Sequence, residues 1–108
     1  IPTGNFPTRE RQARALNGLS LDTAYLLKEM DWVETKLISS TQILTVSQWC
    51  DLSEGLKYLV VYTPNTRDCI AIEPQTANIN SFNNHEGLIL LNPGESKSGK
   101  MKVTLQKL

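Results

Sequence analysis

A carboxylate that closes an apolar run is the first candidate for chemistry in this sequence. The run 69–72 is followed by Glu73 and Pro74, and the nearest basic residue, Arg67, lies on the other side of the run. Burying a carboxylate without an opposite charge favours its protonated form, which suits a general base that works near neutral pH. We therefore expect Glu73 to end a strand, to be mostly buried in a concave surface and to act as a general base. The structural alternative is a glutamate on the solvent face of an edge strand.

Metal and redox chemistry are not indicated by the remaining reactive side chains. Zinc requires four Cys or His ligands at tight spacing, or three with an open position, and the chain offers only Cys50, Cys69 and His85. One disulfide is possible, but two free thiols in a reducing compartment are the preferred interpretation. We therefore expect no metal site and a protein of the reducing cytoplasm.

The elements that must position Glu73 are short strands. Residues 41–49, 58–62, 69–73, 88–91 and 100–108 form β-rich runs separated by turn chemistry. Pro64 and the Pro93-Gly94 pair predict turns at 63–66 and 92–95 that connect strands. Residues 22–40 fit either a helix or short strands, and this pattern leaves the choice open.

Two patterns together predict packed sheets. Met101, Val103 and Leu105 alternate with polar residues, which predicts a strand with one buried face. The run 58–62 has no polar alternation, as expected for a strand covered on both faces. An all-β antiparallel sandwich accommodates both kinds of strand, with Trp32 and Trp49 expected in the core.

Composition limits the class of partner. The chain has 108 residues, 40% of them hydrophobic, and 11 Lys and Arg balance 11 Asp and Glu. One domain is therefore expected, and the zero net charge argues against nucleic acid and membrane surfaces as partners. The apolar runs are far shorter than the roughly 18 residues of a spanning helix. The chain starts at Ile1 without a leader, so we expect a processed or excised piece of a larger protein.

A combination of motifs carries a family resemblance. Residues 61–76, with Glu-Pro-Gln-Thr at 73–76, are followed by Phe82-Asn83, by Gly87-Leu88 and by Asn-Pro-Gly-Glu-Ser at 92–96. This order and spacing closely resembles the C-terminal portion of the aldose 1-epimerase, or galactose mutarotase, family. Residues 1–4 and 21–26 also look like that family, so the resemblance covers most of the chain.

The resemblance implies a fold, an activity and a set of site residues. The fold would be a large antiparallel β-sandwich of the galactose mutarotase-like supersandwich type, of which 1–108 is a C-terminal portion. The activity would be interconversion of the α and β anomers of a hexose, without metal or cofactor. Glu73 takes the position of the catalytic base, and Asp22 that of a carboxylate that hydrogen-bonds sugar hydroxyls. Gln75 would reach the sugar or, equally well, bond nearby backbone.

The resemblance also implies what this chain lacks. The general acid of the family is a histidine from well upstream, and His85 is interpreted as an ordinary loop residue. We expect the chain alone to be inactive, to expose apolar strand residues such as Val60 and Ile72, and to associate with the upstream fragment or with another copy. The alternative function is a non-catalytic carbohydrate-binding or sugar-sensing protein, in which Glu73 and Asp22 only hold hydroxyls.

Overall fold

The computed structural model describes residues 15–27, 31–51 and 55–108 of the chain. This part is built from β1 (Asp22–Leu26), β2 (Trp32–Ile38), β3 (Gln42–Trp49), β4 (Tyr58–Tyr62), β5 (Ala71–Gln75), α1 (Ser81–Asn84) and β6 (Met101–Lys107). These described ranges are all-β apart from one short helix, as the sequence predicts. Within the described ranges, no helix has the length and apolarity needed to cross a membrane.

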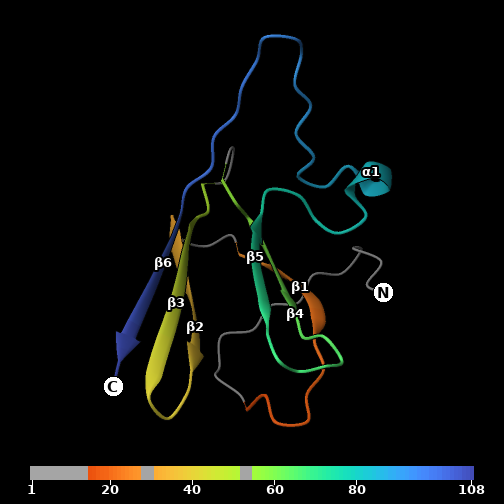
Figure 1. Cartoon of the computed structure of the whole chain (residues 1–108). Coiled ribbons are helices and arrows are strands. Elements are labelled where there is room, and N and C mark those ends of the chain that lie inside the picture. The colour runs from red at the N-terminus through yellow and green to blue at the C-terminus, as the bar shows by residue number, and fades with distance from the viewer. Residues whose placement is uncertain (1–14, 28–30, 52–54) are drawn as a thin grey trace.

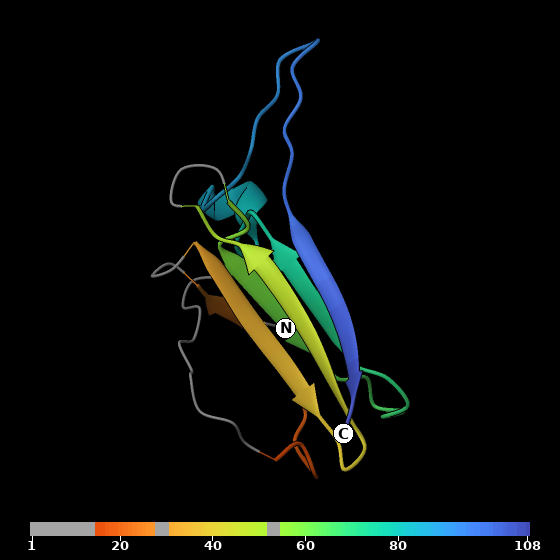
Figure 2. The same ribbon diagram turned by 90° about the vertical axis from the view of Figure 1, so that its left-hand side faces the viewer.

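The strands form two antiparallel sheets, with strand orders β1-β4-β5 and β2-β3-β6. Figure 1 shows the sheets beside one another, and in the view turned by 90° (Figure 2) the β2-β3-β6 sheet lies in front of the other. The chain changes sheet after β1, after β3 and after β5. Each sheet therefore combines a hairpin of consecutive strands, β4-β5 or β2-β3, with one strand from a distant part of the sequence.

The central strand β4 is the best-buried element of the molecule. Its first four residues are buried and only Tyr62 is exposed, because β1 and β5 flank it and side chains cover both of its faces. The prediction of a strand covered on both faces is confirmed for this segment. One of its faces contributes Leu59 and Val61 to a core cluster with Leu21. Six partly buried side chains pack around this cluster: Leu16, Leu19, Tyr25, Leu27, Ile70 and Ile72.

Turn chemistry closes the two hairpins. The Ser39 hydroxyl accepts hydrogen bonds from the amides of Thr41 and Gln42, at 3.2 and 3.0 Å, and so orders the turn between β2 and β3. Between β4 and β5, the Arg67 amide donates to the Pro64 carbonyl at 3.0 Å, which confirms the predicted turn at 63–66. The sequence left the secondary structure of residues 22–40 undecided. The described residues of this segment form the strands β1 and β2 and no helix.

The expected strand at 88–91 is wrong. These residues run toward the predicted turn at 92–95, where the Glu95 amide donates to the Asn92 carbonyl at 3.0 Å, but they pair with no strand in the described structure. Leu90 and Leu91 are 82% and 53% exposed. Without a neighbouring ladder, the apolar character of the run does not suffice to make it a strand.

The prediction of a buried face on the last strand is also wrong. Every residue of β6 is exposed, including Met101, Val103 and Leu105. Edge position alone is not the cause, because β2, the other edge strand of this sheet, keeps every second side chain partly buried. The apolar side of β6 is exposed because no described segment covers it. The prediction that Val60 and Ile72 are exposed is also wrong. Val60 is buried, and Ile72 is partly buried against the core cluster.

Candidate functional site

The strand register places the predicted site residues on one face of the β1-β4-β5 sheet. Asp22 lies opposite Tyr62, and two positions along the ladders Glu73 lies opposite Val60. Gln75 lies opposite Tyr58, two positions further on. Directly paired residues share a face, and residues two apart along a strand share it as well. We call the side of this sheet that carries these side chains the candidate face.

Asp22 lies on the candidate face because the preceding residue, Leu21, is fixed on the other face of the sheet. Leu21 is buried in the core cluster. Its amide donates to the Thr63 hydroxyl at 2.7 Å, and its carbonyl accepts from the Thr63 amide at 2.8 Å. Alternation along the strand then turns Asp22 away from the core, where its side chain is exposed.

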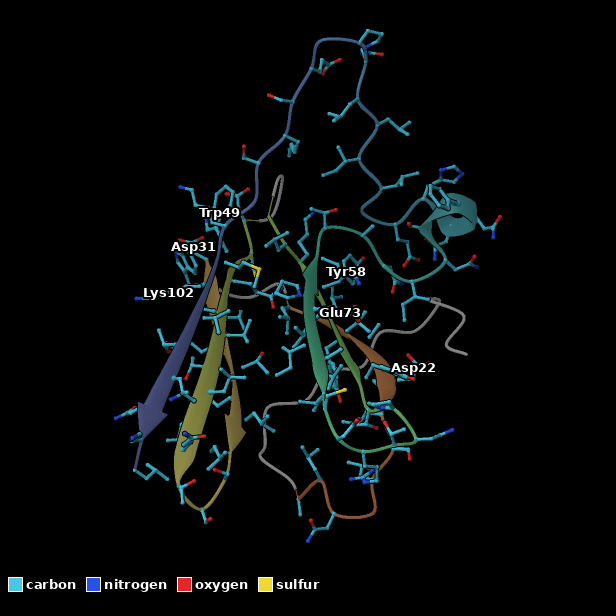
Figure 3. All side chains as sticks on the ribbon, in the orientation of Figure 1. Asp22, Asp31, Trp49, Tyr58, Glu73 and Lys102 are labelled. Atoms are coloured by element: carbon cyan, nitrogen blue, oxygen red, sulfur yellow. The ribbon has the colours of Figure 1, made fainter. Side chains whose placement is uncertain are left out.

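Glu73 lies in the middle of β5, not at its end, and it is exposed. The expectations of a strand terminus and of a mostly buried carboxylate are therefore wrong. The physical reason is the place of β5 at the edge of its sheet, where a side chain has neighbours on one side only. In Figure 3, Glu73 and Asp22 lie in the same sheet, apart from Trp49 and Lys102 of the other sheet.

Asp22 and Glu73 are separated by β4. With neighbouring strands about 4.8 Å apart and an offset of two residues, their Cα atoms lie roughly 12 Å from each other. Between them on the same face lie Ala24 and Val60, which are both buried. The two exposed carboxylates therefore flank a covered part of the sheet.

Gln75 stands at the more enclosed end of the candidate face. It is partly buried and lies opposite Tyr58, which is buried. Burial, reinforced by the negative charge of Glu86, raises the pKa of the Tyr58 hydroxyl. This end of the face is thus less polar than the end that carries Asp22.

A loop from the end of β5 closes over this region. The side-chain amide of Asn78 donates to the Glu86 carboxylate at 2.5 Å, and the backbone amide of Asn78 donates to the backbone carbonyl of Glu86 at 2.9 Å. Gly87, at a φ of 71°, follows directly. A Cβ atom at this position would lie 2.2 Å from the Thr76 carbonyl oxygen and 3.1 Å from a ring carbon of Tyr58. Glycine is therefore required for the loop to pack against the tyrosine.

Sequence reasoning missed two aromatic members of the candidate face. Tyr62 is 43% exposed and lies next to Asp22, where its ring is available to a sugar. Tyr58 shapes the opposite end. The signal was the spacing of the two tyrosines in the run 58–62, which puts both on the same face of any strand.

Other aromatic and imidazole groups lie away from this face. Trp32 and Trp49 are paired across β2 and β3, and Trp32 is 44% exposed, so its expected place in the core is wrong. The Lys100 ammonium lies 5.5 Å from the ring centroid of Trp49. His85 caps the end of α1, where its amide donates to the Ser81 carbonyl at 2.8 Å, and its side chain is exposed on the loop.

The thiols and the acidic groups form no metal centre in the described ranges. Cys50 is buried and Cys69 is exposed, and both are free. No group of three or more His, Cys, Asp or Glu in the described part could hold a metal ion. The polar side chains of the candidate face are the carboxylates of Asp22 and Glu73, the amide of Gln75 and the phenols of Tyr58 and Tyr62.

The comparisons with known proteins leave the chain without an assigned relative. No family model matches it, and no curated protein or solved structure matches it significantly.

Proposed function

We propose that this chain is the C-terminal part of an aldose 1-epimerase-like isomerase and carries the catalytic base of that enzyme. The observation that supports the proposal is the register, which brings Asp22 and Glu73 to the same face of one sheet with Tyr62 beside Asp22. The two carboxylates lie far apart in the sequence, and the resemblance to the family points to the same two residues.

In the proposed reaction, the Glu73 carboxylate accepts the proton of the anomeric hydroxyl. An acid donates a proton to the ring oxygen, the ring opens, and the aldehyde rotates and closes from its other face. Asp22 and Gln75 hold other hydroxyls of the sugar, and Tyr62 covers one of its apolar faces. The acid is supplied from outside the set of residues proposed here, so the proposed enzyme needs a further part of the polypeptide.

A second candidate function is non-catalytic sugar binding. The exposure of Glu73 favours it, because an exposed carboxylate lacks the desolvation that tunes a general base. In this case Glu73 and Asp22 accept hydrogen bonds from hydroxyls and no turnover occurs.

Mutarotation of freshly dissolved α-D-glucose and α-D-galactose, followed by polarimetry, distinguishes the two functions. The protein to test is a longer polypeptide that contains this chain. We expect acceleration that Glu73→Gln abolishes and that Glu34→Gln, on the exposed outer side of β2, leaves unchanged. Sugar binding without acceleration would support the second function. If neither sugar bound nor turned over, both functions would be refuted for these hexoses.

The proposed location of the protein is the cytoplasm, and the proposed partner is a small neutral sugar. Two free thiols are compatible with a reducing compartment, and the balanced charge of the chain favours an uncharged ligand.

A further inference from the structure

The outer edge of β6 presents backbone groups that no strand of the described structure uses. The Lys100 carbonyl accepts from Trp49, and the Leu108 amide donates to Thr41, so the even-numbered residues of this segment face β3. Backbone groups alternate in direction along a strand. The amides and carbonyls of Met101, Val103, Leu105 and Lys107 therefore point outward from the sheet edge.

This edge is complementary to itself when two copies run antiparallel about Thr104. In that register Thr104 lies opposite its own copy, and Val103 lies opposite Leu105 of the other chain. Lys102 then lies opposite Gln106, and Met101 lies opposite Lys107. No like charges are paired, and each outward amide and carbonyl finds a partner, for about eight hydrogen bonds.

Other symmetric registers use the edge less completely. Residues whose backbone groups point outward from the edge pair only with residues of the same kind. The nearest alternative twofold axes therefore lie at Val103 and Leu105, and each of them pairs part of β6 with residues beyond the ends of the strand. The register centred on Thr104 is the one that pairs the whole strand with itself.

The side chains of β6 favour the same arrangement. Met101, Val103 and Leu105 are 51%, 56% and 62% exposed and lie on the same side of the sheet as Val46, which is buried in β3. In the pairing about Thr104, the row that runs from Val46 to Val103 continues to Leu105 of the second copy. A long exposed edge with apolar side chains is the kind of strand that pairs with another chain.

We propose that two copies of this chain associate through antiparallel pairing of their β6 strands about Thr104. The assembly is a continuous sheet with the order β2-β3-β6-β6-β3-β2, and its interface is the same surface on both copies. The inference uses only the edge of the β2-β3-β6 sheet and is independent of the function proposed for the candidate face.

Paired charge variants test the register. Thr104→Lys and Thr104→Glu each place like charges directly opposite each other on the twofold axis, whereas a mixture of the two pairs opposite charges. By light scattering after size-exclusion chromatography, we expect a dimer for the unaltered chain, monomers for each variant alone and a dimer for their mixture. A monomer for the unaltered chain over the whole dilution series would overturn the proposal. A dimer that both variants leave intact would show that another surface joins the copies.

Cysteine cross-linking provides the matched control. In a Cys69→Ser background, Thr104→Cys places two thiols opposite each other at a pair that lacks backbone hydrogen bonds, where Cα atoms lie about 4.5 Å apart. Lys102→Cys, on the same strand and the same side, lies opposite Gln106 and so places its two copies apart. We expect oxidation to cross-link the first variant much faster than the second. Equal rates, or faster cross-linking of the second variant, would contradict the register.

Discussion

Asp22 and Glu73 lie on the same face of the β1-β4-β5 sheet, on the two outer strands and offset by two residues along the ladders. Neither strand alone defines this relationship. It depends on β4, because Tyr62 fixes the register of Asp22 and Val60 fixes that of Glu73. Val60, which lies between the two carboxylates on this face, is buried, so the two exposed carboxylates flank a covered strand.

The first prediction concerns this pair. If the candidate face binds a hexose, Asp22→Asn weakens the affinity by about tenfold, since a hydrogen bond to a charged group contributes roughly 1.5–3 kcal/mol. The affinity is measured by following backbone amide shifts in NMR during a sugar titration. Glu34→Gln, an exposed carboxylate of the other sheet, is the matched control and should change nothing. Equal losses in both variants would contradict a site at Asp22.

The second prediction concerns Gly87. An added Cβ meets the Thr76 carbonyl and the Tyr58 ring, and the backbone has a φ of 71°. We expect Gly87→Ala to lower the free energy of unfolding by more than about 2 kcal/mol, combining backbone strain with a steric clash. Gly94→Ala is the control, since Gly94 has a φ of 86° but no atom within 4 Å of the added Cβ. In urea denaturation, we expect Gly94→Ala to lower the free energy of unfolding by about 1 kcal/mol, from backbone strain alone.

The third prediction concerns Gln48, a fully buried amide of β3. Its Nε2 atom donates to the carbonyls of Leu56 and Tyr58, at 2.6 and 3.0 Å, and so links the end of β3 to the beginning of β4. We expect Gln48→Leu to destabilise the fold by roughly 1–3 kcal/mol, because buried carbonyls lose their donor. Gln42→Leu, at an exposed position of the same strand, is the matched change. In thermal unfolding, we expect Gln48→Leu to melt at a lower temperature than Gln42→Leu. Equal melting temperatures would refute a stabilising role of the Gln48 side chain.

The fourth prediction concerns alkaline pH. Burial raises the pKa of the Cys50 thiol, and burial together with Glu86 raises the pKa of Tyr58. Each group then keeps its proton more tightly when folded than when unfolded. Their contribution to stability is complete below the unfolded values of about 8.5 and 10, and it is lost as pH rises through the folded ones.

Urea denaturation at a series of pH values checks this dependence. We expect the unfolding free energy to fall as pH rises above about 8.5, with a second decline above about 10. Tyr58→Phe should remove the second decline and leave the first. If the unaltered chain held constant stability through both ranges, the predicted linkage would be absent.

The fifth prediction concerns the thiols. Cys69 is exposed and Cys50 is buried, so a thiol reagent should modify one site rapidly in the folded chain and both after unfolding, without prior reduction. Cys69→Ser should abolish the rapid phase, and Cys50→Ser should retain it. No reactive thiol in the unfolded chain would indicate a disulfide and contradict the free-thiol assignment.

The sequence predicted those strands that show a clear local pattern of apolar residues. It did not predict the burial of side chains where burial depends on the segments packed beside the strand. The strand at 58–62 could be predicted because an unbroken apolar run requires cover on both faces wherever it packs. Alternation correctly predicted β6 as a strand. It did not predict that its apolar side would be exposed, because this depends on whether another segment covers β6, and no described segment does. The run 88–91 was wrongly predicted as a strand because strand formation needs a partner, and none of the described strands lies beside it.

The candidate site shows the same limit. The residue types of Asp22, Glu73 and Gln75 could be selected from the sequence, but their common face follows from pairing with β4, which the sequence alone does not specify. The exposure of Glu73 followed from the edge position of β5 and could not be derived from the apolar residues before it. The role of Gln48 was not predicted because its two acceptors, the carbonyls of Leu56 before β4 and of Tyr58 at its first residue, come close to it only in the folded chain.

The alternation of the chain between its two sheets has a consequence for how the molecule is assembled in time. The hairpins β2-β3 and β4-β5 join neighbours in sequence, so their loops close at little entropic cost. The ladder between β3 and β6 must enclose every residue from Cys50 to Lys100, including the whole β4-β5 hairpin. Contacts over such separations form slowly, and within one copy of the chain the described strands hold β6 by a single ladder. The C-terminal strand is therefore the last to join the fold and the first to leave it.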